Sequence, residues 1–154
     1  MIFLVRHGRA EDTHPLGDEA RALTVEGRRE FRELAEDLGD RLGLKGIATS
    51  PLVRATQTAE LLAAGTGVDR VESRGELASG VSPSALVRLA RELGDGWALV
   101  GHNPGMAEAL AQLLGLPEAP RFRKGAIAAL EGVAGGKWQL AWVVSPGRKK
   151  DRSL

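Results

Sequence analysis

The chain contains no cysteine, and this absence removes several kinds of chemistry. Disulfide bonds, thiolate metal sites and a cysteine nucleophile are all excluded. The N-terminus also lacks the charged region and the long apolar stretch of a secretory signal peptide. A protein without disulfides or a signal peptide suits the cytoplasm, and we expect that location.

An excess of charge of one sign is lacking as well. The 154 residues include 21 Lys and Arg against 20 Asp and Glu, so the net charge is +1, and we expect no nucleic-acid partner. The longest apolar runs fall far short of the about 20 residues that cross a bilayer, and we expect no membrane partner. Basic residues do gather near the C-terminus, where we expect a solvated, frayed tail containing Arg148, Lys149, Lys150 and Arg152.

The chain does contain enough apolar material for one packed core. Its hydrophobic content is 43%, and no internal repeat or low-complexity linker divides it, so we expect a single domain over residues 1–154. Short apolar runs alternate with segments of helical spacing. The sequence predicts strands at 1–5, 46–49, 68–73 and 97–100, helices at 24–42, 50–64, 82–93 and 103–114, and a hairpin at 126–133 and 138–144.

This alternation predicts an α/β three-layer sandwich, with a mostly parallel central sheet, helices on both faces and a C-terminal hairpin. In such sheets, ligands bind beyond the carboxyl ends of the strands. Three of the predicted strand ends carry polar groups: Arg6-His7, the segment 50–54, and Gly101-His102. Each is ordinary by itself, because polar residues often follow a strand at the protein surface.

Taken together, the three strand ends predict one site. If the sheet is parallel here, its carboxyl ends meet at one edge and gather Arg6, His7, Arg54 and His102 around one cavity. Such a group of cations is unfavourable unless an anion lies among them. The helices that follow two of these strands would also aim free N–H groups at that edge. Guanidinium groups hold phosphate oxygens with forked donors, so the sequence predicts a site for a phosphoryl group.

The order and spacing of three motifs resemble the histidine phosphatase superfamily, which has the phosphoglycerate mutase-like fold. The motifs are RHG at residues 6–8, SPLVRATQTA at 50–59 and GHNPG at 101–105. Within that superfamily, the compact length and the last two motifs are similar to those of the SixA-type phosphohistidine phosphatases. The phosphoglycerate mutases of the superfamily carry insertions for which 154 residues leave little room.

The resemblance implies a role for each matching residue. His7 would be the nucleophile that forms a covalent phosphohistidine, with its other ring nitrogen donating to a backbone carbonyl. Arg6 and Arg54 would bind the phosphoryl oxygens, and Gly8 would let the backbone turn close to the substrate. His102 would donate a hydrogen bond to the phosphoryl group in the transition state. The cationic surroundings should keep His7 unprotonated, and neither a metal ion nor another cofactor is implied.

The proton donor for the leaving group stays open at this stage. Many members of the superfamily carry a glutamate after the third strand, and Glu76 in RGELASG lies at the matching place. Glu76 can equally be a solvated loop carboxylate. Asp12, His14 and Asp18, in the loop after RHG, are alternatives, for each of which a plain loop residue is the favoured interpretation. The need for a donor depends on the substrate, because a phosphorylated imidazole can leave as a neutral ring, whereas an alkyl phosphate leaves as an alkoxide.

The resulting prediction is a metal-independent phosphatase that removes phosphate from phosphohistidine on a protein. The alternative substrate is a small phosphomonoester, such as a sugar or metabolite phosphate, bound at the same site. A non-catalytic phosphate-binding module is a third interpretation, which His7 disfavours because binding alone needs no nucleophile. A nucleotide-binding fold is a poor fit, since neither G-x-x-x-x-G-K-[ST] nor a G-x-G-x-x-G after the first strand is present.

Overall fold

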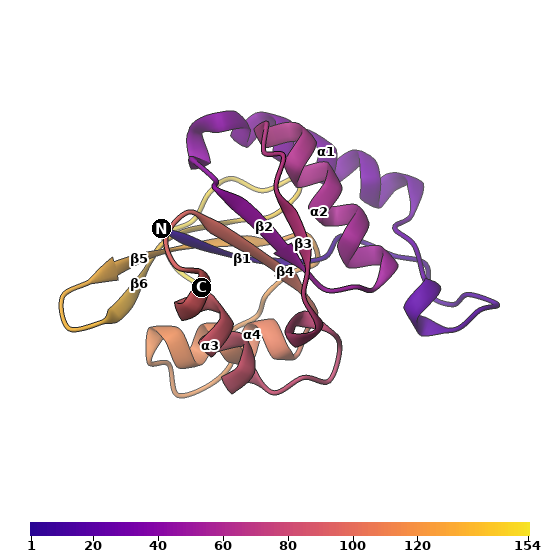
Figure 1. Cartoon of the computed structure of the whole chain (residues 1–154). Helices are drawn as coiled ribbons and strands as arrows, with labels where there is room; N and C mark the ends of the chain where they lie inside the picture. The colour runs from indigo at the N-terminus through magenta and orange to yellow at the C-terminus, as the bar shows by residue number, and fades with distance from the viewer.

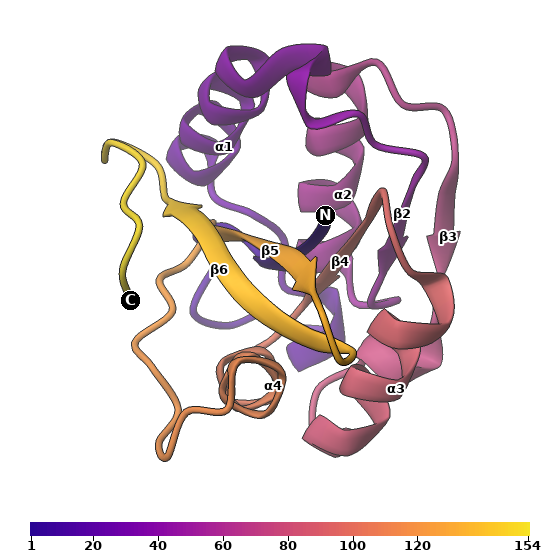
Figure 2. The ribbon, with the colours of Figure 1, turned by 90° about the vertical axis from the view of Figure 1, so that its left-hand side faces the viewer.

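The computed structural model describes all 154 residues and places a six-stranded sheet between two pairs of helices (Figures 1 and 2). The strands are β1 (Ile2–Arg6), β2 (Gly46–Thr49), β3 (Val71–Ser73), β4 (Trp97–Gly101), β5 (Ile127–Val133) and β6 (Lys137–Val144). The helices are α1 (Val25–Leu38), α2 (Val53–Thr66), α3 (Pro83–Leu93) and α4 (Gly105–Leu114), with short 3-10 helices at Asp18–Ala20, Gly39–Leu42 and Gly75–Leu77. None of the helices is both long and apolar enough to span a membrane.

The sheet has the strand order β3-β2-β4-β1-β5-β6. The first four strands of the chain pair in parallel, whereas β5 is antiparallel to β1 and β6 is antiparallel to β5. Helices α1 and α2 cover one face, and α3 and α4 cover the other (Figure 1). The predicted α/β three-layer sandwich, with its mostly parallel sheet and its C-terminal hairpin, is confirmed.

Strand β1 lies inside the sheet and is buried on both faces. Ile2 and Leu4 belong to the core on the side of α3 and α4, whereas Phe3 and Val5 belong to the core on the side of α1 and α2. All four are at most 2% exposed. Side chains alternate between the faces of a strand, so a central strand needs apolar residues at every position. The run IFLV therefore makes a rigid support for the polar residues that follow it.

Two of the predicted helix starts are found where the sequence places them. Thr24 caps α1, because its Oγ1 accepts a hydrogen bond from Gly27 N at 2.9 Å. Ser82 caps α3 in the same way through Ala85 N at 3.3 Å, and Pro83 follows at the start of the helix. These hydroxyl groups satisfy backbone donors that a helix leaves free at its N-terminus.

The other two helices start later than predicted. Ser50 stays in the sheet, where its backbone N donates to Val100 O at 2.9 Å, and α2 begins only at Val53. Helix α4 begins at Gly105, and Asn103 reaches it only through a 3.3 Å bond from Ala107 N to Asn103 Oδ1. At Ser50, the backbone bonding of the sheet thus extends past the point at which the local sequence signals a helix.

The third strand is shorter than predicted, covering Val71–Ser73 instead of residues 68–73. Its expected first residue, Val68, lies just past the end of α2 and closes the last turn of that helix, because its backbone N donates to Ala63 O at 3.1 Å. The β-branched residues in this stretch indicate a strand, but the closing turn of the helix takes up the backbone groups first.

The C-terminal tail is held against the sheet, so the prediction of a frayed tail is wrong. Val143 N in β6 donates to Asp151 O at 2.7 Å, and Asp151 N donates back to Val143 O at 2.8 Å. Lys150 Nζ lies 4.3 Å from the centroid of the Trp142 ring, a cation–π contact. The tail therefore runs beside the outer edge of β6, held there by the backbone of Asp151 and by the contact of Lys150 with Trp142.

Candidate active site

The sheet register brings the ends of β1, β2 and β4 together at one edge. Arg6 pairs with Gly101 across the β1–β4 ladder, and β2 pairs with the other side of β4. Backbone bonds continue one residue further, from His7 N to Gly101 O (3.1 Å) and from Ser50 N to Val100 O (2.9 Å). The three predicted strand ends therefore meet, and backbone bonding fixes the residues that follow them.

His7 lies at this edge, and only 7% of its surface is exposed. Its Nδ1 lies 2.7 Å from Gly8 O, and a carbonyl oxygen only accepts, so Nδ1 donates its proton there. The Nε2 of the neutral ring then keeps a free lone pair. Burial is the main cause that lowers the pKa of His7 to about 3, and nearby cations lower it further. The ring is therefore neutral at neutral pH, and the expected backbone acceptor is present.

Gly8 does not make the left-handed turn that glycine favours. Its φ is not positive, unlike that of many other glycines in the chain. A Cβ at this position would lie 3.4 Å from Leu23 Cδ2, which is close but within van der Waals contact. The backbone here is held instead by Gly8 N, which donates to Thr58 Oγ1 at 3.1 Å. A turn is therefore not the reason for glycine at this position.

His102 lies beside His7, with the ring centroids 5.1 Å apart. Its Nε2 lies 2.7 Å from Ser50 Oγ, which also accepts from Leu52 N at 3.2 Å. The Ser50 hydroxyl proton has no other acceptor here, so it bonds to His102 Nε2 and leaves the ring proton on Nδ1. Nδ1 is buried and has no partner in the protein. Burial, followed by the charge of Arg54, lowers the pKa of His102 to about 4.

Two guanidinium groups surround the histidines. Arg54, from the first turn of α2, is 5% exposed, and it donates from Nη1 to Asp18 O (2.8 Å) and from Nη2 to Asp18 Oδ2 (3.1 Å). Arg6 donates from Nη1 to Phe122 O (3.0 Å), and its buried Nε has no partner. Each guanidinium carries five N–H donors, so both keep donor capacity for an oxyanion.

None of the carboxylates considered as proton donors hydrogen-bonds either of these histidines. Glu76 forms an ion pair with Arg74 at 2.9 Å, and this contact is the main cause that lowers the pKa of Glu76. The pKa of Asp18 is also lowered, chiefly by its hydrogen bond with Arg21 and then by Arg54. Asp12 is exposed and forms no ion pair. Glu76 and Asp18 are therefore ionised at neutral pH, and the roles of all three carboxylates stay predictions.

Sequence reasoning missed three contacts of the site: Ser50 with His102, Thr58 with Gly8, and Asp18 with Arg54. Thr58 had a usable signal, because it follows Arg54 by four residues and so lies on the same helical face. Ser50 had none, since a serine before a proline also fits a helix cap. Asp18 lies 36 residues from its partner, in a short 3-10 helix within the long connection between β1 and α1.

The arrangement can hold a tetrahedral oxyanion between guanidinium groups and an imidazole N–H, next to the lone pair of a second imidazole. These groups are the ones that transfer of a phosphoryl group to His7 Nε2 requires. No group of three or more His, Cys, Asp or Glu side chains is placed to hold a metal ion.

Comparison with known sequences gives two matches. A sequence profile described as the histidine phosphatase superfamily (branch 1) matches residues 2–79, a stretch that includes RHG and SPLVRATQTA. An uncharacterized protein of Picosynechococcus sp. is 32% identical over 118 residues, which cover 70% of this chain and 68% of that protein.

Comparison with solved structures gives matches over nearly the whole chain. The protein histidine phosphatase SixA, solved with tungstate, has a TM-score of 0.80 and 26% identity, covering 94% of this chain and 96% of that one. A phosphoserine phosphatase from Entamoeba histolytica, solved with 3-phosphoglyceric acid, has a TM-score of 0.71 and 16% identity, covering 95% and 97%. The second likeness shows the fold alone. The first protein is named for action on a phosphorylated histidine of a protein, and the second is named for action on phosphoserine.

Proposed function

The chain belongs to the histidine phosphatase superfamily, and we propose that it is a phosphatase that removes phosphate from phosphohistidine on a protein. The observation that carries the proposal is the pair of buried neutral histidines, with ring centroids 5.1 Å apart, among the guanidinium groups of Arg6 and Arg54. The likeness to the SixA structure supports the same substrate class. The cationic groups need an anion, and the neutral His7 supplies a nucleophile that mere binding would not require.

The reaction follows from the positions of the four side chains. His7 Nε2 attacks the phosphorus in line, a new N–P bond forms, and the bond between phosphorus and the substrate nitrogen breaks. Arg6 and Arg54 neutralise the phosphoryl oxygens while charge is redistributed. His102 donates from Nδ1 to one of these oxygens. Water then attacks the phosphohistidine on His7 and releases inorganic phosphate, which restores the neutral ring.

The state of the carboxylates favours phosphohistidine over an alkyl phosphate. Glu76 is bound to Arg74 and Asp18 to Arg54, and the pKa of each carboxyl is lowered, so neither holds a proton to donate at neutral pH. An alkoxide needs such a proton, whereas a substrate imidazole that is protonated on its free nitrogen leaves as a neutral ring. A small phosphomonoester is the second candidate substrate, because the Entamoeba histolytica protein that shares this fold is named a phosphoserine phosphatase.

The nucleophile can be tested by trapping the covalent intermediate. We expect the wild-type protein to take up a phosphoryl group from a histidine peptide phosphorylated with phosphoramidate, detected by intact mass at alkaline pH. The His7→Ala variant should show no uptake and lose about 1,000-fold or more in phosphate release. His14→Ala is the matched control: His14, whose Nδ1 accepts from Leu16 N, is a candidate proton donor only, and a phosphohistidine substrate needs no such donor. Normal labelling of His7→Ala would disprove the assignment.

The substrate class can be tested with a panel at fixed pH. We expect kcat/KM on a phosphohistidine peptide to exceed that on glucose 6-phosphate and phosphoserine by a factor of about 100 or more, because only the first needs no strong acid. A reversed order would make the small phosphomonoester the substrate. Binding of phosphate without turnover of any member of the panel would instead indicate a non-catalytic module.

A further inference from the structure

A groove leads from the candidate active site toward the C-terminal tail. It consists of two neighbouring cavities of about 500 Å³ and about 420 Å³. Both are lined by Arg121, Phe122, Arg123, Ser145 and Arg148, so one continues into the other. The walls are the segment between α4 and β5 and the chain that follows β6. We call the two cavities together the basic groove.

One end of the basic groove shares its wall with the active site. Arg6 and Asn103 line this end, and both donate to Phe122 O at 3.0 Å. Gly125 N donates to His7 O at 2.9 Å, and Phe122 itself is 2% exposed. The segment that forms the groove is therefore fixed to the strand that carries the nucleophile, and a ligand in the groove would lie at a defined distance from it.

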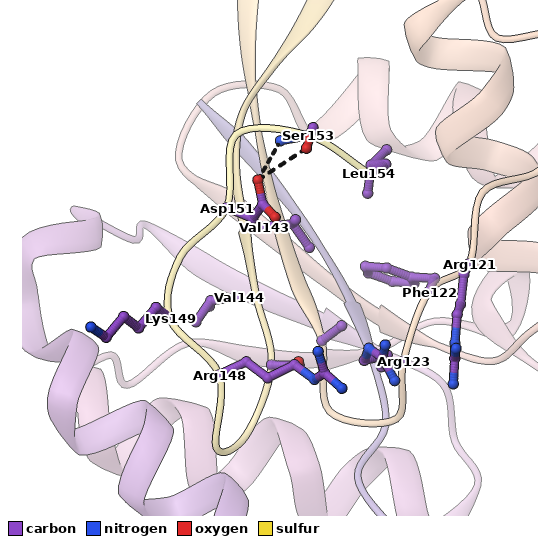
Figure 3. A pocket seen from close by; sticks show the side chains of 12 residues that line it. Arg121, Phe122, Arg123, Val143, Val144, Arg148, Lys149, Asp151, Ser153 and Leu154 are labelled. Atoms are coloured by element: carbon purple, nitrogen blue, oxygen red, sulfur yellow. Dashed lines mark hydrogen bonds between the residues drawn. The ribbon is translucent and has the colours of Figure 1, made fainter.

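The groove is strongly positive although the whole chain is almost neutral. The cavity nearer the site is lined by one acidic residue, Glu30, and by six basic ones: Arg6, Arg9, Arg121, Arg123, Lys124 and Arg148. Glu30 is already paired with Arg9 at 2.6 Å. The farther cavity has one acidic side chain, Asp151, whose Oδ1 accepts from Ser153 N and Oγ at 3.0 Å (Figure 3). Asp151 keeps its negative charge, because these partners are neutral, yet the basic residues still outnumber the acidic side chains that line the two cavities.

Three of these arginines lie together without an anionic partner. Figure 3 shows the guanidinium ends of Arg148, Arg123 and Arg121 in a row along the groove. None of the three forms an ion pair with the protein. The pKa of Arg123 is lowered, by burial first and then by the charges of Arg121 and Arg148. Neighbouring cations of this kind repel one another until an anion lies between them.

The shape of the groove favours an extended ligand. A small ester with a single phosphate would occupy the site around His7 and leave the row of arginines without an anion, whereas a polypeptide could occupy both. The backbone of the tail that forms one wall is held by its pairing with β6, so the backbone that carries Arg148 does not need to be ordered upon binding.

We propose that the basic groove binds an acidic segment of polypeptide, with Asp and Glu carboxylates on Arg121, Arg123 and Arg148, while the phosphorylated histidine of the same protein lies in the active site. The proposal rests on the proposed function, because it assigns the recognition surface for the protein substrate. It makes the local sequence around the phosphohistidine, and not only the phosphoryl group, a determinant of the rate.

The test compares two histidine peptides phosphorylated with phosphoramidate, one with four Glu residues near the phosphohistidine and one with Gln in their place. We expect wild-type kcat/KM to be about tenfold higher on the Glu peptide at low salt, the size that three exposed ion pairs give, and the preference to shrink at 0.5 M NaCl. The variant R121Q/R123Q/R148Q should lose the preference and keep its rate on the Gln peptide. The matched control is R28Q/R32Q/R88Q, which removes three exposed arginines from α1 and α3 and should keep the preference.

Equal rates of the wild-type protein on both peptides at low salt would overturn the proposal. A groove-dependent gain on fructose 1,6-bisphosphate over fructose 6-phosphate, without a preference between the peptides, would also overturn it and make the groove a site for a second phosphate. Binding of the unphosphorylated Glu and Gln peptides, measured by fluorescence anisotropy, separates the two hypotheses. Tighter binding of the Glu peptide that depends on the three arginines would support the groove even if no phosphohistidine were hydrolysed, a result that would refute only the proposed function.

Discussion

Arg54 is held by an internal anion before any substrate arrives. Its guanidinium donates to both the backbone oxygen and the carboxylate of Asp18. The Arg54 side chain is 6% exposed, whereas that of Asp18 is 59% exposed, so the carboxylate can leave without disturbing the core. In the proposed function, a substrate phosphate binds the same guanidinium. Asp18 would then compete with the substrate, and with the phosphate product, for Arg54.

This competition predicts the effect of Asp18→Asn. We expect KM for a phosphohistidine peptide and the inhibition constant of inorganic phosphate to fall together, by roughly fivefold, because one exposed ion pair no longer has to be broken. Steady-state kinetics with added phosphate measures both, and Glu19→Gln, an exposed neighbour in the same short helix, is the control. A loss of kcat confined to alkyl phosphates would instead make Asp18 the proton donor.

Ser50 is the second residue whose role is visible only in the structure. Its hydroxyl bonds to His102 Nε2 at 2.7 Å and so keeps the proton of the ring on Nδ1. We expect Ser50→Ala to lower kcat about tenfold with little change in KM, because the other tautomer presents no proton to the phosphoryl group. The nitrogen chemical shifts of the His102 ring, measured by NMR, should change from the Nδ1–H pattern to a mixture. Unchanged shifts would contradict this positioning role.

At this scale, the sequence predicted which side chains come together but not how they are bonded. His7, His102, Arg6 and Arg54 could be grouped because each follows a strand end of a parallel sheet. The bond from Ser50 to His102 depends on the exact register between β2 and β4, which no local pattern specifies. The contact of Asp18 with Arg54 depends on the path of a loop, where a sequence gives even less geometric information.

Among the elements, α1 and α2 pack closely because a glycine lies between them. A Cβ at Gly65, in the last turn of α2, would lie 2.6 Å from both the carbonyl carbon and the Cβ of Ala35 in α1. That distance is too short for any side chain, so the two helices could not keep their present separation. The site depends on this packing, because α2 carries Arg54 and Thr58.

We therefore expect Gly65→Ala to destabilise the protein, although alanine is the better helix former. Overpacking costs about 1–3 kcal/mol, which exceeds the gain of about 1 kcal/mol in helix propensity. Urea unfolding at pH 7 measures the free energy of unfolding. Gly75→Ala is the control, since its Cβ would meet nothing within 4 Å, and that variant should stay near the wild-type value.

The order and type of the elements followed from sequence patterns, whereas some of their ends did not. Thr24 and Ser82 mark true helix starts because the side chain of each accepts a bond from a backbone N three residues later, Gly27 N and Ala85 N. Ser50 is also a serine before a proline, yet its backbone N donates to Val100 O in β4, and α2 begins only at Val53. Tertiary hydrogen bonds thus decide where a local signal takes effect.

For the molecule as a whole, the two buried histidines link stability to pH. Their pKa values, about 3 for His7 and about 4 for His102, lie below the ordinary value of 6.5. At a pH between the folded and the ordinary pKa of each histidine, the unfolded chain therefore binds more protons than the folded one. Stability is therefore constant with respect to these groups above pH 6.5 and falls as the pH drops toward 4.

We expect the free energy of unfolding to fall between pH 7 and pH 5 by about 2 kcal/mol for each of the two histidines, beyond the change that other groups cause. Urea unfolding at the two pH values measures it. The double variant H7N/H102N should lose this component, while H14N, which changes a histidine outside the site, should behave like the wild type. An equally steep pH dependence in the double variant would refute the assignment.

The pairing of the C-terminal tail with β6 also affects the association of the protein with other copies of itself. A free sheet edge is a template on which a second chain can add a strand. At one edge, β3 is only three residues long. At the other, β6 has eight residues, but Asp151 occupies both backbone groups of Val143. A truncation that removes residues 148–154 would therefore free backbone groups on the longer edge, and it would favour sheet-to-sheet association and aggregation of a chain that is otherwise still folded.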